Sequence, residues 1–265
     1  MARLLPSLVT LLLAASGAGA APRLPPEGGV DYQLGGAYPP DPRVATVVRD
    51  STAQPSAGHY NICYVNGFQT QPGDLDWWLD HHPQAVLRQD GQPVADPGWP
   101  DEYALDTSTP QGRDGIALAV GAAIRRCADA GFDAVEFDNL DSWTRFAGLT
   151  AEGNLALATR LVAAAHRLGL AAGQKNAPDL AARGPAAGFD FAISEECAVW
   201  NECGAYHAQY GDRHIDIEYS DAPARDLDFA QVCRLPDQPR RTVLRDRLLL
   251  RQGQPGYVFA LCDPG

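Results

Sequence analysis

The sequence predicts one α/β domain folded as a (β/α)8 barrel of the TIM type. Strand-like and helix-like segments alternate about seven or eight times, which is typical of a parallel sheet with right-handed crossovers. No Pro/Ser-rich linker divides the chain, and 265 residues suit one large domain. For a single domain of this length, a closed barrel fits the alternation better than an open sheet.

The chain begins with a segment typical of a secretory signal peptide over residues 1–20. Arg3 supplies the positive end, an apolar stretch follows, and small residues suit cleavage near Ala20. Residues 21–29 are rich in Pro and Gly and are expected to form a disordered lead before the barrel domain at 30–265. We therefore expect a secreted or periplasmic protein, and no later segment is long enough to span a membrane.

The first strands are predicted from β-branched and aromatic runs bounded by turn signals. They cover Val30–Gly36, Val44–Arg49 and His59–Asn66, and the last ends in an Asn-Gly turn. The aromatic stretch over residues 68–100 is too long for an ordinary connection, so a functional loop is expected there. Tyr103–Asp106 is predicted as a weak strand.

Two helices are predicted with clear ends. The first has Thr109 as its N-cap and Pro110 at its first position, and it runs to about Ala130. The second covers residues 152–168, and a glycine follows each helix. A strand over residues 133–139 lies between them. The remaining chain continues the alternation, with strands at 170–175, 189–194 and 214–219, helical pieces near 178–183, around 206 and at 229–233, and less regular segments at 242–249 and 257–262.

The formal net charge of −12 limits the partners of this chain. An acidic surface argues against binding to nucleic acid or anionic membranes and suits a neutral or cationic ligand. No G-x-G-x-x-G or G-x-x-x-x-G-K-[ST] pattern follows a predicted strand, so the usual sequence signatures of a nucleotide-binding site are absent. We therefore expect no nucleic-acid partner, no membrane partner and no cofactor, and a monomer.

Six cysteines follow the predicted signal peptide. An even number in an exported chain favours disulfides over metal ligands, and the sequence leaves most of the pairings open. Only Cys197 and Cys203 are close enough along the chain for one bond to be predicted, closing a short loop. No C-x-x-C or mixed His/Cys spacing indicates a zinc site.

Polar side chains follow nearly every predicted strand, and most of them are acidic. In a barrel, the carboxyl ends of all strands open onto one face, where such folds carry their chemistry. Lys175, the single lysine of the chain, is one of these strand-end residues, and a compact ammonium is not replaced equally by arginine. The strand-end set comprises Asn66, Asp106, Asp138, Asn139, Asp141, Lys175, Asn176, Glu195, Glu196, Glu218 and Tyr219.

Side-chain alternation predicts which of two adjacent glutamates points into the barrel. Along residues 189–194 the large apolar side chains share a face with Glu195, and the small ones share a face with Glu196. If large side chains face the helices and small ones face the crowded barrel axis, Glu196 points inward. The same rule places Asp216 and Glu218 inward on the strand 214–219. Glu218 is then either a third site acid or a structural counter-charge.

Two facing carboxylates are the groups that glycoside hydrolysis requires, one as a protonated acid and one ionised. The strongest candidate run ends at Asp138, which shares a strand face with Glu136. Burying two acids without a use or a partner is costly, although a purely structural ion-pair cluster is the alternative. Glu136 lies one layer deeper and suits barrel support, which leaves Asp138 as the reactive group.

The chain resembles the endo-α-1,4-polygalactosaminidases of glycoside hydrolase family 114 over about residues 30–262. The resemblance implies a (β/α)8 barrel that hydrolyses α-1,4-linked galactosamine or N-acetylgalactosamine polymers by a retaining reaction. It also implies a nucleophile at Asp138 and an acid/base at Glu196. The matching segments are DYQLGG at 31–36, NICYVN at 61–66, GFDAVEFDNLD at 131–141, QKN at 174–176, FDFAISEEC at 189–197 and IEY at 217–219.

These features combine into one hypothesis, an exported endo-glycosidase acting on a cationic, galactosamine-rich polysaccharide. Asp138 attacks the anomeric carbon, and Glu196 protonates the leaving oxygen and then activates water. Lys175 helps to keep Asp138 ionised, because a nearby cation lowers a carboxyl pKa. The candidate substrate-binding residues are Asp106, Asn139, Asp141, Lys175, Asn176, Glu218, Tyr219 and Tyr64.

Two alternatives come from other classes of protein. The first is a non-catalytic polysaccharide-binding barrel, in which the acids only accept hydrogen bonds. The second is a metal-dependent hydrolase with Asp138, Asp141 and Glu218 around a hard cation such as Ca²⁺ or Mg²⁺. The sequence places no histidine close to these acids, which counts against a transition metal.

Overall fold

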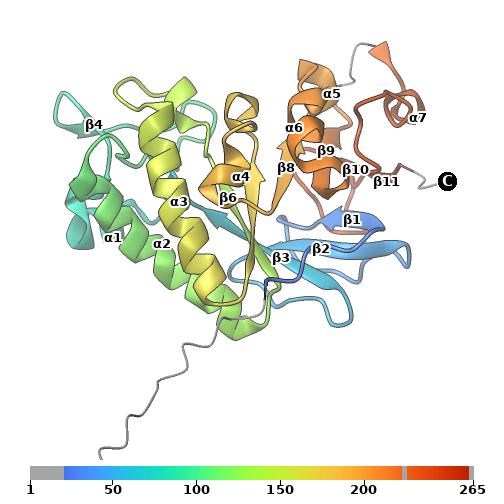
Figure 1. Cartoon of the computed structure of the whole chain (residues 1–265), viewed down its shortest axis with the longest axis horizontal. Helices are drawn as coiled ribbons and strands as arrows, with labels where there is room; N and C mark the ends of the chain where they lie inside the picture. Colours follow the sequence, from blue (N-terminus) through green and yellow to red (C-terminus); the bar gives the residue numbers. More distant parts are fainter. Residues whose placement is uncertain (1–20, 223–225, 263–265) are drawn as a thin grey trace, which may run out of the picture.

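The computed structural model describes residues 21–222 and 226–262, and within them the predicted β/α barrel is confirmed (Figure 1). The described strands form a nine-stranded sheet in the order β1-β2-β3-β6-β7-β8-β9-β10-β11, parallel throughout except for antiparallel β11. The strands are β1 (Gly29–Tyr32), β2 (Val44–Asp50), β3 (Tyr60–Asn66), β6 (Ala134–Asp138), β7 (Ala171–Lys175), β8 (Phe191–Glu195), β9 (His214–Tyr219), β10 (Arg241–Arg245) and β11 (Phe259–Leu261). The predicted signal peptide lies outside the described residues.

The seam of the barrel lies between β1 and β10, which approach each other without forming a ladder. Arg245 of β10 is fully buried and crosses this seam. Its guanidinium donates to the Tyr32 carbonyl and to Asp31 Oδ1 at 3.1 Å. An ion pair and a hydrogen bond to the backbone therefore hold β1 and β10 together.

The two long helices that the sequence predicts are present, and they pack on β3, β6 and β7. Helix α2 (Pro110–Ala130) starts where the Thr109 side chain accepts a bond from the Gly112 amide at 3.0 Å. It ends at Gly131, whose φ of 92° is a left-handed conformation that glycine adopts at little cost. Helix α3 (Ala151–Arg167) starts in the same way at Thr150.

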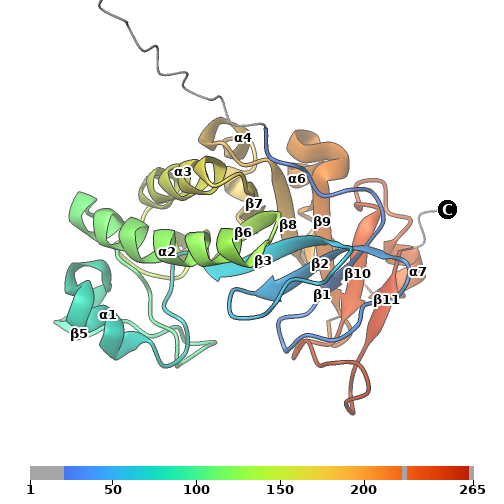
Figure 2. The same cartoon turned by 90° about the horizontal axis from the view of Figure 1, so that it is seen from below.

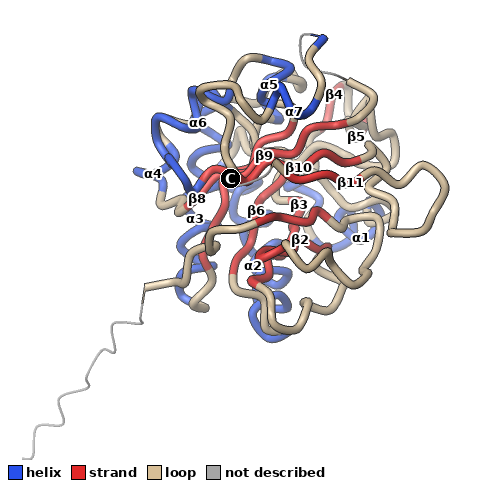
Figure 3. The backbone as a smooth tube through the Cα atoms, turned by 90° about the vertical axis from the view of Figure 1, so that its right-hand side faces the viewer, coloured by secondary structure: helices blue, strands red, loops and turns tan. Residues whose placement is uncertain are grey.

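The helix layer is incomplete, because short loops without a helix join β1 to β2 and β2 to β3 (Figure 2). Figure 3 shows the strands gathered in the middle of the molecule, with helices toward its outside. The shorter helices are α1 (Leu75–His81), α4 (Gly184–Ala187), α5 (Cys197–Trp200), α6 (Cys203–Tyr210) and α7 (Phe229–Val232), with 3₁₀ turns at Pro83–Ala85, Ser142–Thr144, Pro178–Leu180 and Gly211–Arg213.

The long aromatic stretch has structure of its own. It holds α1 and a small hairpin of β4 (Arg88–Gln89) and β5 (Gln92–Pro93). The predicted strand at Tyr103–Asp106 is wrong, because this segment makes only isolated bridges within the same loop and never joins the barrel. The backbone of residues 103–105 pairs with Gln69, Val86 and Ala95, so the long loop folds back on itself.

The expectation that large side chains face the helices and small ones face the barrel axis is wrong for β8 and β9. Phe191 and Ile193 of β8 and Ile215 and Ile217 of β9 belong to the interior cluster rather than to the helix-facing core. The reason lies on the neighbouring strand, where a Cβ on Gly173 would be 2.6 Å from the Phe191 ring. Small residues on β7 leave the axial space that large side chains of β8 fill.

All six cysteines are paired, and the predicted Cys197–Cys203 bond is present. The two other disulfides join Cys63 to Cys127 and Cys233 to Cys262. The lead at residues 21–28 has no regular structure, but the Tyr60 hydroxyl donates to the Arg23 carbonyl at 2.6 Å. Among the residues placed by the structure, no helix is both long and apolar enough to cross a membrane.

Candidate active site

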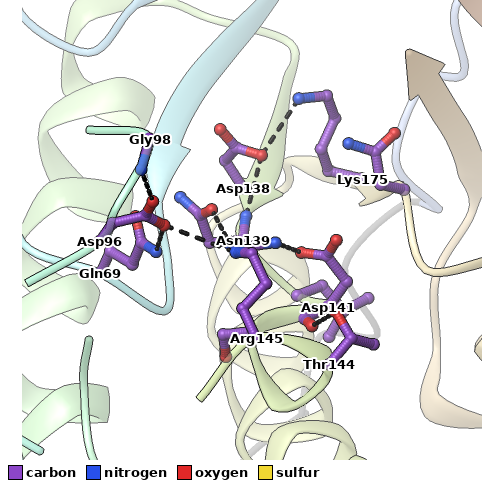
Figure 4. A network of polar contacts seen from close by, with 12 residues as sticks. Gln69, Asp96, Gly98, Asp138, Asn139, Asp141, Thr144, Arg145 and Lys175 are labelled. Atoms are coloured by element: carbon purple, nitrogen blue, oxygen red, sulfur yellow. Dashed lines mark hydrogen bonds and ion pairs between the residues drawn. The ribbon is translucent and has the colours of Figure 1, made fainter. Parts of the chain in front are cut away.

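Asp138, the last residue of β6, receives three hydrogen bonds at the open end of the barrel, and Figure 4 shows those from Lys175 and Asn139. The Tyr64 hydroxyl donates to Oδ2 at 2.7 Å, while Lys175 Nζ and the Asn139 amide donate to Oδ1 at 3.1 and 2.8 Å. Burial alone raises the pKa of the Asp138 carboxyl, but the Lys175 charge and these hydrogen bonds together lower it below its usual value. The carboxylate is therefore held ionised, as a nucleophile requires.

Lys175, the last residue of β7, lies between two carboxylates. Its side chain is 1 % exposed, and its ammonium contacts Asp138 Oδ1 at 3.1 Å and Glu195 Oε2 at 3.0 Å. Burial favours the neutral amine, yet the charges of Asp138 and Glu195 raise the pKa of Lys175 well above its usual value. A cation shared in this way fixes the separation of the two acids.

Glu195, the last residue of β8, is the glutamate that faces Asp138. The Tyr219 hydroxyl donates to Glu195 Oε1, and Lys175 binds Oε2. Asn176 holds the same residue twice, since its Nδ2 donates to Oε2 at 3.3 Å and its Oδ1 accepts the Glu195 amide at 2.8 Å. The predicted site residues Tyr219 and Asn176 thus converge on Glu195.

The inward orientation predicted for Glu196 is wrong. Glu195 shares the interior face with Ile193, and the chain turns sharply at Glu196, where φ is 58°. The Glu196 carboxylate instead pairs with Arg247 at 2.7 Å, and the Arg247 guanidinium lies 4.4 Å from the centre of the Tyr219 ring. Glu196 therefore belongs to the rim of the site, and its catalytic role stays a prediction.

Left-handed backbone recurs at this end of the barrel. Asn139, Asn176 and Glu196 each follow directly after a barrel strand, with φ of 63°, 48° and 58°. Residues other than glycine adopt such conformations at a cost of about 1–3 kcal/mol, and they cluster at functional sites. Three neighbouring strands therefore end in turns that aim the preceding carboxylate or ammonium at one point.

Asp216 and Glu218 lie on the outer face of β9, so their predicted inward placement is also wrong. Asp216 Oδ1 accepts the Ser194 hydroxyl at 2.6 Å and the Cys197 amide, and Glu218 Oε1 accepts the Ala198 amide at 2.8 Å. Burial, with the neighbouring Asp216 charge, raises the pKa of Glu218 to about 9. Asp216 and Glu218 therefore bind the backbone of the segment that follows Glu196, on the side of β9 that faces the helices.

Asn139 and Asp141 belong to a second network, next to Asp138 (Figure 4). Arg145 donates to Asn139 Oδ1 at 2.6 Å and pairs with Asp141 at 2.8 Å and with Asp96 at 3.5 Å. Asn139 Nδ2 in turn donates to Asn66 at 3.0 Å. Asn139 and Asp141 therefore fix the turn that presents Asp138.

Sequence reasoning missed Glu102 and Arg145. Glu102 accepts a bond from Asn66 Nδ2 at 2.9 Å, and burial raises its pKa to about 7. Neither residue follows a barrel strand, so the strand-end criterion could not select them. The long loop folds back over the barrel and brings Glu102 to the site.

Asp106 does not join this cluster. Its carboxylate accepts the amide of Ser108 at 2.8 Å and the hydroxyl of the same residue, in the turn before α2. Its predicted place at a barrel strand end is wrong, because the segment before it is not a barrel strand. The carboxylate shapes the entry to α2.

Glu136 lies below Asp138 on the same strand face and is fully buried. Tyr32 donates to its Oε1 at 3.0 Å, and its Oε2 has no partner among the described residues. Burial raises the pKa of Glu136 to about 8, against the lowering effect of the Lys175 charge. The neutral acid thus supports the site without adding a charge at neutral pH.

The described residues do not favour a metal centre. The one group of possible ligands within them is Cys197, His214 and Asp216, and Cys197 is committed to a disulfide. Glu218 lies on the opposite face of its strand from the interior that Asp138 enters. The set of acids considered for a hard cation therefore does not converge on one point.

The model of glycoside-hydrolase family GH114 matches residues 13–265. No curated protein matches the chain in sequence. Ega3 of Aspergillus fumigatus, solved with galactosamine, superposes with a TM-score of 0.70 at 20 % identity, covering 89 % of this chain and 95 % of that one.

A second solved structure, the glycoside hydrolase domain of PelA from Pseudomonas aeruginosa, has a TM-score of 0.60 at 18 % identity. It covers 85 % of this chain and 97 % of that one. At these identities the likeness shows a shared fold, whereas the family model spans nearly the whole chain. The chain therefore belongs to glycoside-hydrolase family GH114, and the protein is a glycosidase.

Proposed function

We propose that the protein is an exported endo-glycosidase that cleaves α-1,4-linked galactosamine polymers with retention of anomeric configuration. One observation carries this proposal: Asp138 and Glu195 contact the same Lys175 ammonium at 3.1 and 3.0 Å. The two contacting oxygens are therefore at most about 6 Å apart, a spacing that suits retaining enzymes better than inverting ones. The family assignment favours this enzyme over a non-catalytic binding barrel.

In the proposed reaction, Asp138 attacks the anomeric carbon and forms a covalent glycosyl ester. A glutamate donates a proton to the leaving oxygen and later removes a proton from the water that cleaves the ester. Forming the ester removes one negative charge from beside Lys175. The Lys175 ammonium can then pair with the acid/base glutamate, which is ionised once it has given up its proton.

The geometry favours Glu195 as the acid/base, because Glu195 enters the barrel opposite Asp138. To act as the acid, Glu195 first takes up a proton and gives up its ion pair with Lys175, whose ammonium stays on Asp138. Glu196, the residue implied by the family resemblance, stays the second candidate. Its carboxylate is held on the rim by Arg247 at 2.7 Å. The two residues are adjacent in the chain but have different partners, so single substitutions separate their roles.

The proposed substrate is cationic. The chain has a formal net charge of −12, and complementary charge attracts a polymer that carries free amino groups. The structural neighbour Ega3 was solved with galactosamine. Residual acetylation of the polymer is compatible with this reasoning, provided that free amines remain.

The test compares the unmodified protein with Asp138→Asn, Glu195→Gln and Glu196→Gln on galactosamine polymer. Chain length of the products is followed by mass spectrometry, and the first-formed anomer by NMR. We expect Asp138→Asn to lose about 10³-fold or more in rate, and Glu195→Gln about 10²- to 10⁴-fold.

A first-formed anomer of the opposite configuration would overturn retention. Full activity of Asp138→Asn would overturn the nucleophile. A larger loss in Glu196→Gln than in Glu195→Gln would return the acid/base role to Glu196. Binding of the polymer with no shortening by the unmodified protein would overturn the proposed activity on this substrate.

A further inference from the structure

A cavity of about 340 Å³ lies outside the barrel, between α1, α2 and the carboxyl ends of β2 and β3. It exists because no helix follows β2, so the flank of α2 beside β3 is not covered by the helix layer (Figure 2). Helix α1, contributed by the long loop, forms its far wall. The residues that define it for this argument are Asn66, Gln69, Gln71, Asp74, Trp77 and Arg126.

Trp77 gives this cavity an aromatic wall that is already oriented. Trp77 is 45 % exposed. His81 stacks on its ring at 4.9 Å with an interplanar angle of 17°, and Trp78 meets it edge-on at 5.5 Å. The indole is therefore held in place before any ligand arrives, which reduces the entropy cost of binding.

Polar side chains with no partner of their own line the same cavity. Gln71, Asp74 and Arg126 make no side-chain hydrogen bond or ion pair within the described residues, and Asp74 does not cap the helix that it precedes. Gln69 is 1 % exposed, and its Oε1 has no partner although its Nε2 donates to Asp96. Unpaired donors and acceptors beside an aromatic face match the hydroxyls and the apolar face of a pyranose ring.

The cavity is separate from the catalytic centre. Asn66 forms the wall between them, since its side chain accepts from Asn139 and donates to Glu102 on the catalytic side. A polysaccharide long enough to pass this wall can contact both places. A short oligomer bound only beside Asp138 does not enter the cavity.

We propose that this cavity is a second carbohydrate site, which binds one pyranose unit of the polysaccharide substrate. In this site Trp77 stacks on the sugar, the Asp74 carboxylate accepts from its ammonium or hydroxyls, and Arg126 donates to its hydroxyl oxygens. The inference rests on the proposed function, because it takes the polymer as the ligand. The site increases the affinity for long chains and leaves the chemistry at Asp138 unchanged.

The experiment measures polymer affinity and short-substrate activity separately. Affinity electrophoresis with galactosamine polymer is done in the inactive Asp138→Asn background, with Trp77→Ala or Arg126→Ala added. We expect each to weaken polymer binding about tenfold, equivalent to about 1.4 kcal/mol. The matched control is Arg125→Ala, which removes the same charge from the same helix at a residue outside the cavity.

Hydrolysis of a galactosamine trimer by the otherwise unmodified enzyme is the second readout. Trp77→Ala and Arg126→Ala are expected to change this rate by less than about twofold, because the trimer does not reach the cavity. Unchanged polymer affinity in both variants, or an equal loss in Arg125→Ala, overturns the second site. Failure of the unmodified enzyme to cleave either substrate overturns the proposed function instead.

Discussion

At the scale of single residues, the site depends on one lysine. Lys175, which is 1 % exposed, neutralises part of the charge of Asp138 and Glu195 at 3.1 and 3.0 Å, and these two side chains are 20 % and 27 % exposed. Without it two carboxylates would remain close together with no counter-charge, and such an arrangement raises carboxyl pKa values. The compact ammonium fits between them, whereas a planar guanidinium has a different shape.

Lys175→Met is expected to destabilise the protein and to change its pH profile. Removing one partner of a buried ion pair costs about 3–5 kcal/mol. The pKa of Asp138 should rise, so the acidic limb of the kcat/KM profile should move to higher pH. Urea unfolding and pH–rate profiles measure the two effects. An unshifted acidic limb in a folded Lys175→Met protein would show that Lys175 does not set the ionisation of Asp138.

Tyr64→Phe tests the second group that holds Asp138. The Tyr64 hydroxyl donates to Asp138 Oδ2 at 2.7 Å, so its loss should raise the pKa of Asp138 and lower kcat/KM about tenfold at acidic pH. Tyr60→Phe is the control on the same strand, because its hydroxyl binds the Arg23 carbonyl. Equal losses in both variants would indicate a general effect of phenol removal on β3.

At the scale of elements, the outward-facing acids of β9 support the end of β8 and the loop that follows it. Folding raises the pKa of Glu218 from its ordinary 4.5 to about 9. Between these values the folded protein binds more protons than the unfolded chain, so this group lowers the free energy of unfolding as the pH rises. The contribution is constant below the lower value and fully lost above the upper one.

Glu218→Gln should therefore reduce the loss of stability between pH 5 and about pH 9. Glutamine keeps an oxygen for the Ala198 amide and a donor for Asp216. The measurement is urea unfolding at several pH values for both proteins. Glu152→Gln, on the protein surface, is the control and should leave the slope unchanged. Parallel pH profiles for Glu218→Gln and wild type would contradict the shifted ionisation.

The contact between β7 and β8 provides a packing test. Gly173→Ala places a Cβ 2.6 Å from the Phe191 ring and should cost about 1–3 kcal/mol of stability. Adding Phe191→Leu should recover part of this loss, because it removes the clashing ring atoms. Gly121→Ala in α2 meets no atom within 4 Å and should stabilise the helix by about 0.5–1 kcal/mol. Thermal denaturation distinguishes these cases, and an unchanged stability of Gly173→Ala would refute the packing account.

At the scale of the whole molecule, the net charge of −12 should influence catalysis through association. Attraction of a cationic polymer is screened by salt, so kcat/KM should fall about threefold or more from ~0.05 to ~0.5 M ionic strength. A fully acetylated, neutral polymer is the control and should show a weaker dependence. The same salt response for both polymers would argue against charge-based recognition.

Much of the barrel could be predicted from the sequence. The strand over 214–219 and the helix from Pro110 to Ala130 have the predicted ends, because capping residues and alternation are local signals. The grouping of Asp138, Lys175 and Glu195 also follows, since parallel strands in a barrel deliver their ends to one face. Glu102 could not be found in this way, because only the folding of the long loop brings it there.

By itself, then, the sequence determined the barrel, the acidic end of β6 and the lysine beside it. The tertiary structure alone decided which of Glu195 and Glu196 faces Asp138, and that Asp216 and Glu218 face outward. Alternation shows which residues share a strand face but not which face is the interior, because both faces of a barrel strand are buried. That choice depended on Gly173, a residue on the neighbouring strand, whose missing side chain leaves room for Phe191 on the barrel axis.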